Sequence, residues 1–322
     1  MDLSKTTFEA NLPKRVSYIL ATKNHADKLD EALKRMRTFK GREDELLIMD
    51  GGSTDHTKEV VKKHADIVDT FISEPDVQPA FCRIGFDGKP NKDPIHAVNK
   101  GIFLARGKYI KTISDDDIYH PEGMKQAIKV MEEHPEIDLL MCGGSRERNG
   151  RIEYVYLPRG VNYGRRVEDV FQYGRGCGVG HFFRRSALAR AGLHPFYKFK
   201  PNGEFIVNAD AEYVLKFFKS GATVRFCRIN AFHSPYSHYD YPSLGFVKES
   251  SEKYWLRSAR DNCSFGFYIR FHLSNIIKKN ALFGKFVYIR KIIRKMIKNR
   301  KIKYFLGKKI SRAEMVWDGG FS

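Results

Sequence analysis

We predict an α/β protein whose mostly parallel sheet is flanked by helices, and two observations carry this prediction. Between Val16 and Ser73, short runs of branched and aromatic residues alternate with stretches of helical periodicity, a rhythm typical of βαβ units. The same rhythm resumes at residue 94 and continues to about Gly144. A chain of 322 residues with 42% hydrophobic content can bury such a core, which excludes a largely disordered protein.

The elements follow from these patterns in chain order. We expect strands at 16–22, 45–49, 67–73, 108–113 and 137–144, and helices at 26–37, 56–64, 94–106 and 121–134. After residue 150 the pattern becomes mixed, with short strands expected at 153–157, 177–183 and 223–229 and a helix at 210–221. We therefore expect one domain over 1–245, with halves of about 14–145 and 146–245, followed by a basic helical region over 246–322.

The net charge of +19 is concentrated in one stretch, because residues 262–313 contain 15 Lys or Arg and no Asp or Glu. Such a stretch favours an anionic partner. At 286–298 helical spacing puts aliphatic residues on one side and cations on the opposite side, the pattern of an amphipathic helix lying on a membrane surface. We expect contact with an anionic membrane through about 265–312; a helix packed on the body and a nucleic-acid-binding tract are the alternatives.

Targeting signals are missing from the sequence as it stands. The first fifteen residues contain no apolar stretch, and no window approaches the roughly 18 apolar residues of a spanning helix. The five cysteines are scattered and form no C-x-x-C pair. We expect a cytoplasmic protein in a reducing compartment that is peripheral to the cytoplasmic face of a membrane.

Asp115, Asp116 and Asp117 directly follow the expected strand at 108–113. Adjacent carboxylates repel one another unless a cation or a hydrogen-bonding turn compensates them. Carboxylate oxygens at a strand end suit Mg²⁺ or Mn²⁺ bridging to substrate phosphates. The alternative is an exposed acidic turn that caps the next helix.

Two further polar segments accompany the acidic turn. Residues 50–55, DGGSTD, follow a strand, where paired glycines let the backbone approach a ligand and Ser53 or Asp55 can cap the next helix. Residues 208–213, NADAEY, open a helix on which Asp210 and Glu212 point to different sides. A capped turn without ligand is the alternative for the first segment.

Together these segments resemble the glycosyltransferases of family 2, nucleotide-sugar-dependent enzymes of GT-A type. The likeness covers about residues 16–236. Each motif is weak alone, but their combination and order are specific. The motifs are ATKN at 21–24, where the family usually has PTYN, ELLIMDGGSTDHT at 45–57, ISEPD at 72–76, AVNKGIFLARGKYI at 97–110, ISDDDIYHPE at 113–122 and NADAEYVLKF at 208–217.

The resemblance implies a GT-A fold, which is Rossmann-like, with a nucleotide-binding half at 14–145, an acceptor-side half at 146–245 and the basic helical extension. It implies an inverting, metal-dependent transfer from a nucleotide-diphosphate sugar, UDP-linked in our prediction, to a cell-surface glycan or lipid-linked acceptor. Asp117 and His233 would hold Mn²⁺ or Mg²⁺, and Asp210 would remove the acceptor's proton. The residues that would bind the donor are Ala21, Thr22, Asn24, Asp50, Gly51, Asn99, Lys100, Asp115 and Asp116.

The acceptor side would include His181 and Glu212. The alternative for His181 is simple packing. The alternative for His233 is a surface or core position without a ligand. Gly51 stands where many family members carry a second Asp, and residues 77–92 enlarge a linker that is normally short. A nucleic-acid-binding protein is an alternative from another class. A nucleotidyltransferase is another, although no G-x-G phosphate loop lies near the N-terminus.

Overall fold

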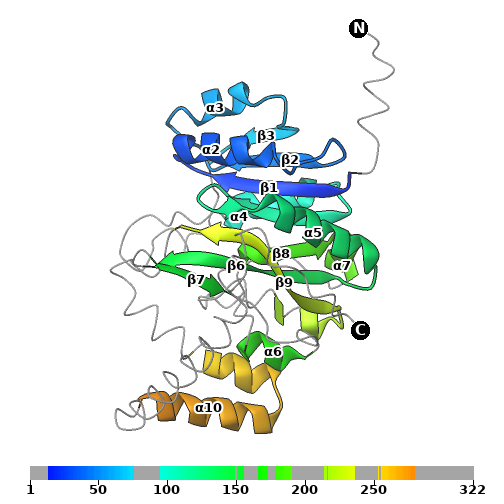
Figure 1. Cartoon of the computed structure of the whole chain (residues 1–322), viewed down its shortest axis with the longest axis vertical. Coiled ribbons are helices and arrows are strands. Elements are labelled where there is room, and N and C mark those ends of the chain that lie inside the picture. Colours follow the sequence, from blue (N-terminus) through cyan, green and yellow to red (C-terminus); the bar gives the residue numbers. More distant parts are fainter. Residues whose placement is uncertain are drawn as a thin grey trace, which may run out of the picture.

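The computed structural model describes residues 14–75, 95–148, 151–155, 166–172, 178–190, 214–215, 217–235, 253 and 255–279. These residues form a nine-stranded mixed sheet with the strand order β3-β2-β1-β4-β8-β6-β9-β5, and β7 pairs with β6. Helices cover both faces of the sheet (Figure 1). The predicted α/β class is therefore confirmed.

The first half of the sheet is parallel, as the βαβ rhythm predicts. β1 pairs with both β2 and β4, and β2 pairs with β3, all in parallel. β1 and β2 are nearly continuous runs of buried residues, which is typical of parallel strands covered on both faces. The elements of this half are β1 (Val16–Thr22), α2 (Ala26–Met36), β2 (Glu45–Asp50), α3 (Thr57–Lys63), β3 (Thr70–Ser73), α4 (Ile95–Leu104) and β4 (Tyr109–Ser114).

The second half is mixed. β6 and β9 run parallel, whereas β8 is antiparallel to β4 and β6, and β5 is antiparallel to β9. The elements are β5 (Ile118–Tyr119), α5 (Pro121–Glu133), β6 (Leu139–Arg148), β7 (Arg151–Val155), α6 (Val167–Gln172), a 3₁₀ turn (Gly178–Gly180), β8 (His181–Arg184), α7 (Arg185–Arg190), β9 (Val224–Ser234) and α10 (Phe265–Lys279).

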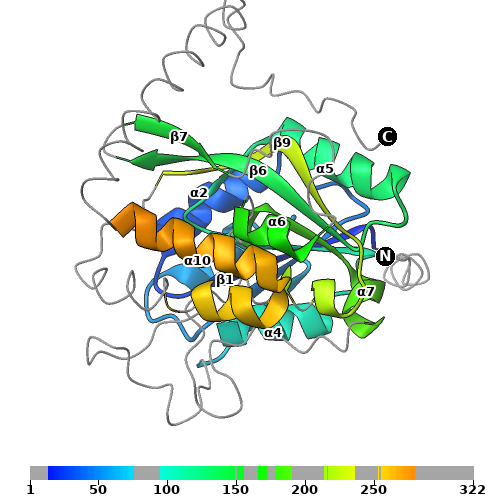
Figure 2. The same cartoon turned by 90° about the horizontal axis from the view of Figure 1, so that it is seen from below.

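Alternate residues of each strand supply two cores, one on each face of the sheet. Tyr18 and Leu20 of β1 belong to a cluster covered by α2, α3 and α5. Ile19, between them, belongs to the opposite cluster, with residues from α4, α6, α7 and α10. This period of two is what a strand imposes on its side chains. Figure 2, turned from the first view, shows α10 on the same side of the sheet as α6 and α4.

Two glycines bring helices close to the sheet. A Cβ at Gly101 of α4 would lie 2.3 Å from Cγ2 of Ile19, and one at Gly123 of α5 would lie 2.0 Å from the carbonyl oxygen of Asn230. Both distances are far below van der Waals contact, so α4 and α5 can pack at their observed depth only because these residues lack a side chain.

The parallel register brings three strand ends to one edge of the sheet. Thr22 is paired with Asp50, and Ala21 with Ser114. The chain segments that follow β1, β2 and β4 therefore start side by side, where ligands bind in open α/β sheets. Residues 286–298, the predicted amphipathic helix, lie outside the described residues. Among the described residues, no helix is both long enough and apolar enough to span a bilayer.

Candidate functional site

The hydroxyl of Thr22, at the end of β1, donates a hydrogen bond to Asp115, which follows β4. The Oγ1–Oδ2 distance is 2.8 Å, and Nδ1 of His25 lies 3.3 Å from the same carboxylate oxygen. Asp115 is only 6% exposed. Burial raises the pKa of its carboxyl above the ordinary value, although the bonds from Thr22 and His25 act to lower it. The two predicted donor-binding residues Thr22 and Asp115 are thus in direct contact.

Asp50, at the end of β2, organises the turn that contains the glycine pair. Its carboxylate accepts hydrogen bonds from the backbone N–H of Ser53, from the Ser53 hydroxyl and, at 2.6 Å, from the hydroxyl of Ser73. The N–H of Gly51 donates to the carbonyl of Thr22 at 3.0 Å. Gly52 has a φ of +79°, which a residue with a Cβ adopts only with strain. Asp50 therefore shapes the loop beside Thr22.

The ATKN segment is bound to the same loop through Asn24. Asn24 has a φ of +53°, and its side-chain Oδ1 accepts the N–H of Thr54 at 2.8 Å, while its own N–H donates to the Ser53 hydroxyl at 2.8 Å. The loops after β1 and β2 thus hold each other in place. Ala21 lies at the end of the same strand, paired with Met49 and Ser114.

Asp55 caps two helices at once. It accepts the N–H of Ala26 at the start of α2 at 3.0 Å, and both the N–H and the hydroxyl of Thr57 at the start of α3. Although burial acts to raise its pKa, these bonds lower it below the ordinary value. The sequence predicts the cap on α3. No local sequence pattern predicts the bond to α2, because Ala26 and Asp55 are 29 residues apart.

The remaining predicted donor residues lie around this edge. The hydroxyl of Ser114 donates to Asp116, next to the buried Asp115 and Asp117. Lys100, on α4, pairs with Glu74, which follows β3, and the predicted donor residue Asn99 precedes it on the same helix. The acidic turn directly after β4 is where the strand pattern predicts it.

Strand pairing brings the backbone of the two predicted metal ligands to neighbouring positions. Ile118 of β5, next to Asp117, is paired with His233 of β9. Asp117 is 3% exposed, and His233 is half-buried. Nδ1 of His233 lies 3.0 Å from the hydroxyl of Ser145 on β6, a contact that holds the imidazole in one orientation. Sequence alone does not identify Ser145 as a partner, because it lies 88 residues away.

A carboxylate and an imidazole are both ligand types that suit a divalent metal such as Mn²⁺. Among the described residues there is no group of three or more His, Cys, Asp or Glu side chains that could hold a metal by itself. An ion held here would therefore need further oxygen ligands from a substrate, as Mg²⁺-type ions do when they bridge to phosphates. The residues present fit a metal that arrives with a diphosphate.

His181, the predicted acceptor-side residue, is fully buried on β8. Neither ring nitrogen has a hydrogen-bond partner within the described part of the chain. Burial, with a smaller effect of the nearby Lys111 ammonium, lowers the pKa of the imidazole to about 3. Its ring meets Phe183 edge-on, with the centroids 5.6 Å apart. This environment favours a neutral imidazole and is that of a packed side chain.

Asp210 and Glu212, the predicted base and second acid, lie outside the described residues, as do residues 77–92. The segment after them is described in part: Val214, Leu215 and Phe217 are helical and buried, and Gly221 ends that stretch with a φ of +75°. The helix predicted at 210–221 is thus present where the structure describes it.

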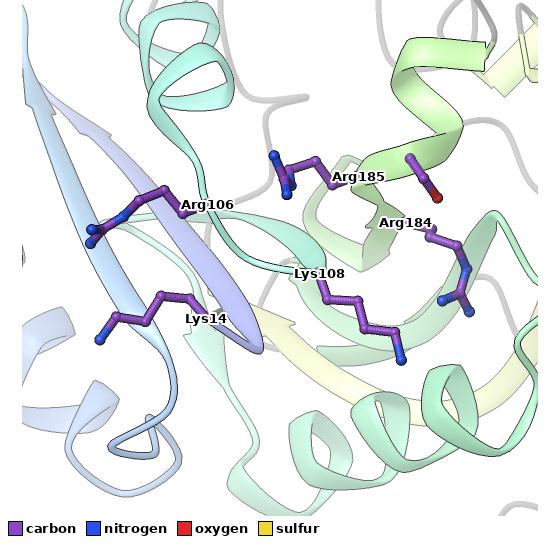
Figure 3. A pocket seen from close by; sticks show the side chains of 6 residues that line it. Lys14, Arg106, Lys108, Arg184 and Arg185 are labelled. Atoms are coloured by element: carbon purple, nitrogen blue, oxygen red, sulfur yellow. The ribbon is translucent and has the colours of Figure 1, made fainter. Parts of the chain in front are cut away.

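A separate pocket of about 300 Å³ lies at the other end of β1 and β4 (Figure 3). Lys14 and Arg106 line one side of it and Lys108 and Arg184 the other, with Arg185 and Ser186 at the start of α7. Lys14 faces Asp69 at 3.8 Å, and Arg106 is paired with Glu45 at 2.9 Å. This pocket is at the opposite edge of the sheet from the acids described above, so it is not part of the same site.

Comparison with known proteins identifies a matching family and structures that share the fold. The model of the family described as "Glycosyl transferase family 2" matches residues 17–192, more than half of the chain. Uncharacterized glycosyltransferases of Rickettsia conorii and Rickettsia felis are each 32% identical to this chain over 120 residues. The match covers 37% of this chain but 18% of each relative, so the chain spans less than a fifth of their length.

Solved structures share the fold at low identity. TarS 1–349 from S. aureus superposes with a TM-score of 0.52 at 17% identity, over 69% of this chain and 60% of that chain. The same protein in complex with UDP-GlcNAc gives a TM-score of 0.52 over 70% of this chain and 59% of that one. A mycobacterial protein gives 0.51 at 14% identity, over 80% and 76%.

Proposed function

The chain belongs to glycosyl transferase family 2 and is a glycosyltransferase, and on this premise we propose that it transfers a sugar from a UDP-linked donor with inversion at the anomeric carbon. Family membership selects this class over the nucleotidyltransferase and the non-enzymatic nucleic-acid-binding protein. One observation carries the proposal: polar residues at the ends of β1, β2 and β4 meet at one edge of the sheet, where Thr22 is bonded to Asp115 and Asn24 is bonded to the loop after β2.

The donor lies against this edge in our proposal. Two loops carry Thr22, Asn24, Asp50 and Gly51, and side-chain bonds hold these loops in place. Such an edge suits a base and ribose. Asp115 and Asp116 face the sugar side of the nucleotide, and Asn99 and Lys100 border it from α4. UDP is our choice of nucleotide because TarS, which shares the fold, was solved with UDP-GlcNAc.

Asp117 and His233 hold Mn²⁺ or Mg²⁺ in our proposal, together with the donor's diphosphate. The buried carboxylate and the imidazole fixed by Ser145 support this assignment. A divalent ion held by these two residues would supply positive charge to offset the charge of the departing diphosphate.

The acceptor is a cell-surface glycan or a lipid-linked sugar, and Asp210 takes the proton from its attacking hydroxyl. The carbon–oxygen bond to the diphosphate breaks as the new glycosidic bond forms on the opposite face of the sugar. Glu212 lies on the acceptor side in this scheme. We place the enzyme at the cytoplasmic face of a membrane, where the basic segment 262–313 meets anionic lipid.

Release of nucleoside diphosphate from a panel of UDP-, GDP- and TDP-linked sugars tests the donor assignment. We expect UDP-sugars to be turned over in the presence of Mn²⁺ and the other two classes to be turned over much more slowly. Faster release from GDP- or TDP-sugars would replace UDP in the proposal, and release from none of them with any divalent metal would contradict it.

A further inference from the structure

The helix α10 has two unlike faces. Its inner face packs on α6: Phe267 is 7% exposed, and the rings of Phe267 and Phe271 lie 6.0 and 5.8 Å from the ring of Phe171. The start of the helix is fixed there too, because the N–H and hydroxyl of Ser264 lie within 3.4 Å of a carboxylate oxygen of Glu168. Figure 1 shows α10 at the lower margin of the molecule.

The outer face carries an exposed apolar row, which we call the α10 stripe: Phe265, Ile269, Leu273 and Ile276. Their exposed fractions are 77%, 37%, 51% and 52%. The spacing of four, four and three residues puts all four on one side of the helix, roughly opposite Phe267 and Phe271. At 1.5 Å per residue the row is about 16 Å long. Folding of the described residues therefore leaves a continuous apolar strip facing outward.

Charge in the same stretch of sequence indicates what covers this strip. From residue 262 to 313 the sequence contains 15 Lys or Arg and no acid, and Arg270 stands on α10 itself. A second copy of the chain would bring two such cationic segments together, and nucleic acid would offer the apolar row no apolar partner. An anionic lipid surface offers both acyl chains for the row and negative headgroups for the cations.

We propose that the α10 stripe is the lipid-contacting face of this protein and inserts among the acyl chains at the surface of an anionic bilayer. This inference rests on the proposed location at a membrane and assigns the contact to four named residues. This contact defines the orientation of the protein on the bilayer. The inner face of α10 stays packed on α6, and α10 lies between the rest of the protein and the membrane.

Co-sedimentation with vesicles tests the stripe, using equal parts of phosphatidylglycerol and phosphatidylcholine, and phosphatidylcholine alone as the uncharged reference. In the full chain we change Leu273→Gln together with Ile276→Gln, which alters no charge. The matched control is Phe103→Gln with Leu104→Gln, two exposed residues on α4, a helix that Figure 1 shows well apart from α10. We expect at least a tenfold drop in the partition coefficient for the α10 pair on the anionic vesicles and little change for the α4 pair.

Three results would overturn the inference. Equal partitioning of the α10 variant and the native protein would show that the stripe does not meet lipid, and an equal loss in the α4 control would show no preference for α10. A clear fall in melting temperature of the α10 variant without vesicles would show that the stripe packs within the protein. Nucleotide release from UDP-sugar in solution, measured on the same variant, stays at the native level if only the membrane contact fails and is absent in both proteins if the proposed function fails.

Discussion

Thr22 and Asp115 are 93 positions apart in the sequence, yet the hydroxyl of one donates to the carboxylate of the other at 2.8 Å. The parallel pairing of β1 with β4 produces this contact, because both strands end at the same edge. It aims a buried carboxylate at the place where we propose that the donor binds. The contact therefore links the fold of the sheet to the orientation of one acid.

Thr22→Val removes the donor of this bond while keeping the size and shape of the side chain. We expect UDP affinity to fall about tenfold, because a hydrogen bond to a charged group is worth on the order of 1.5–3 kcal/mol and the carboxylate loses its orientation. Isothermal titration calorimetry measures the change. Thr22→Ser keeps the hydroxyl and should bind UDP like the native protein; a loss of equal size in both variants would mean that the methyl group and not the bond is important.

Asp55→Ala should lower the free energy of unfolding by about 1–2 kcal/mol, because the starts of α2 and α3 both lose an acceptor for their N–H groups. Chemical denaturation measures this. Asp55→Asn keeps an acceptor oxygen and should recover part of the loss. An unchanged denaturation midpoint for Asp55→Ala would show that water replaces the cap at no cost.

His181→Phe should make the protein less sensitive to acid. The pKa of His181 is about 3 in the folded chain and near 6.5 when exposed, so the unfolded state binds more protons between these values. Its contribution to stability is complete above pH 6.5 and is lost as the pH falls toward 3, by up to about 1.4 kcal/mol per pH unit. Phenylalanine has no proton to bind, so that part of the slope should disappear.

The melting temperature of both proteins, followed from pH 7.5 to 4, measures the effect of His181→Phe. Parallel curves for the two proteins would contradict a buried neutral imidazole. The same variant tests the acceptor role: normal turnover at pH 7.5 would exclude His181 from acceptor binding, and lost turnover with intact UDP affinity would support it.

Asp210→Asn should bind UDP-sugar normally but lower turnover by about 10²–10⁴, because a general base acts on the acceptor only in the transition state. Steady-state kinetics separate kcat from donor affinity. Glu212→Gln is the matched control on the second acid of the same motif, and we expect it to retain more activity. Near-native turnover of Asp210→Asn would remove this residue from the mechanism.

Local patterns were sufficient to predict the first half of the fold. The strand that becomes β4 and the acidic turn after it follow from a buried run bounded by polar residues. The insertion of β8 between β4 and β6 does not, because a period of two identifies a strand but not its neighbours. That insertion makes the sheet mixed, and the pairing of β5 with β9 puts His233 opposite Ile118.

The partners of site residues were the least predictable part. Ser73, Ser145 and His25 contact Asp50, His233 and Asp115 across long sequence separations, and serine or histidine in a loop carries no signal of such a bond. The α10 stripe could not be identified from the sequence for another reason. At 265–276 apolar residues occur on both the inner and the outer face, so the sequence shows little amphipathic character. Only the packing of the inner face on α6 distinguishes the two sides.

The most direct test of the account is the affinity for UDP with and without Mn²⁺, measured by calorimetry on the native protein and on Asp117→Asn. Asp261→Asn is the matched control, since Asp261 is an exposed carboxylate that pairs with the adjacent Arg260. We expect Mn²⁺ to raise the UDP affinity of the native protein and of Asp261→Asn at least tenfold, and to have little effect on Asp117→Asn, whose melting temperature stays native. Equal UDP affinity of the native protein in Mn²⁺ and in EDTA would contradict the account, because no metal would then join Asp117 to the diphosphate.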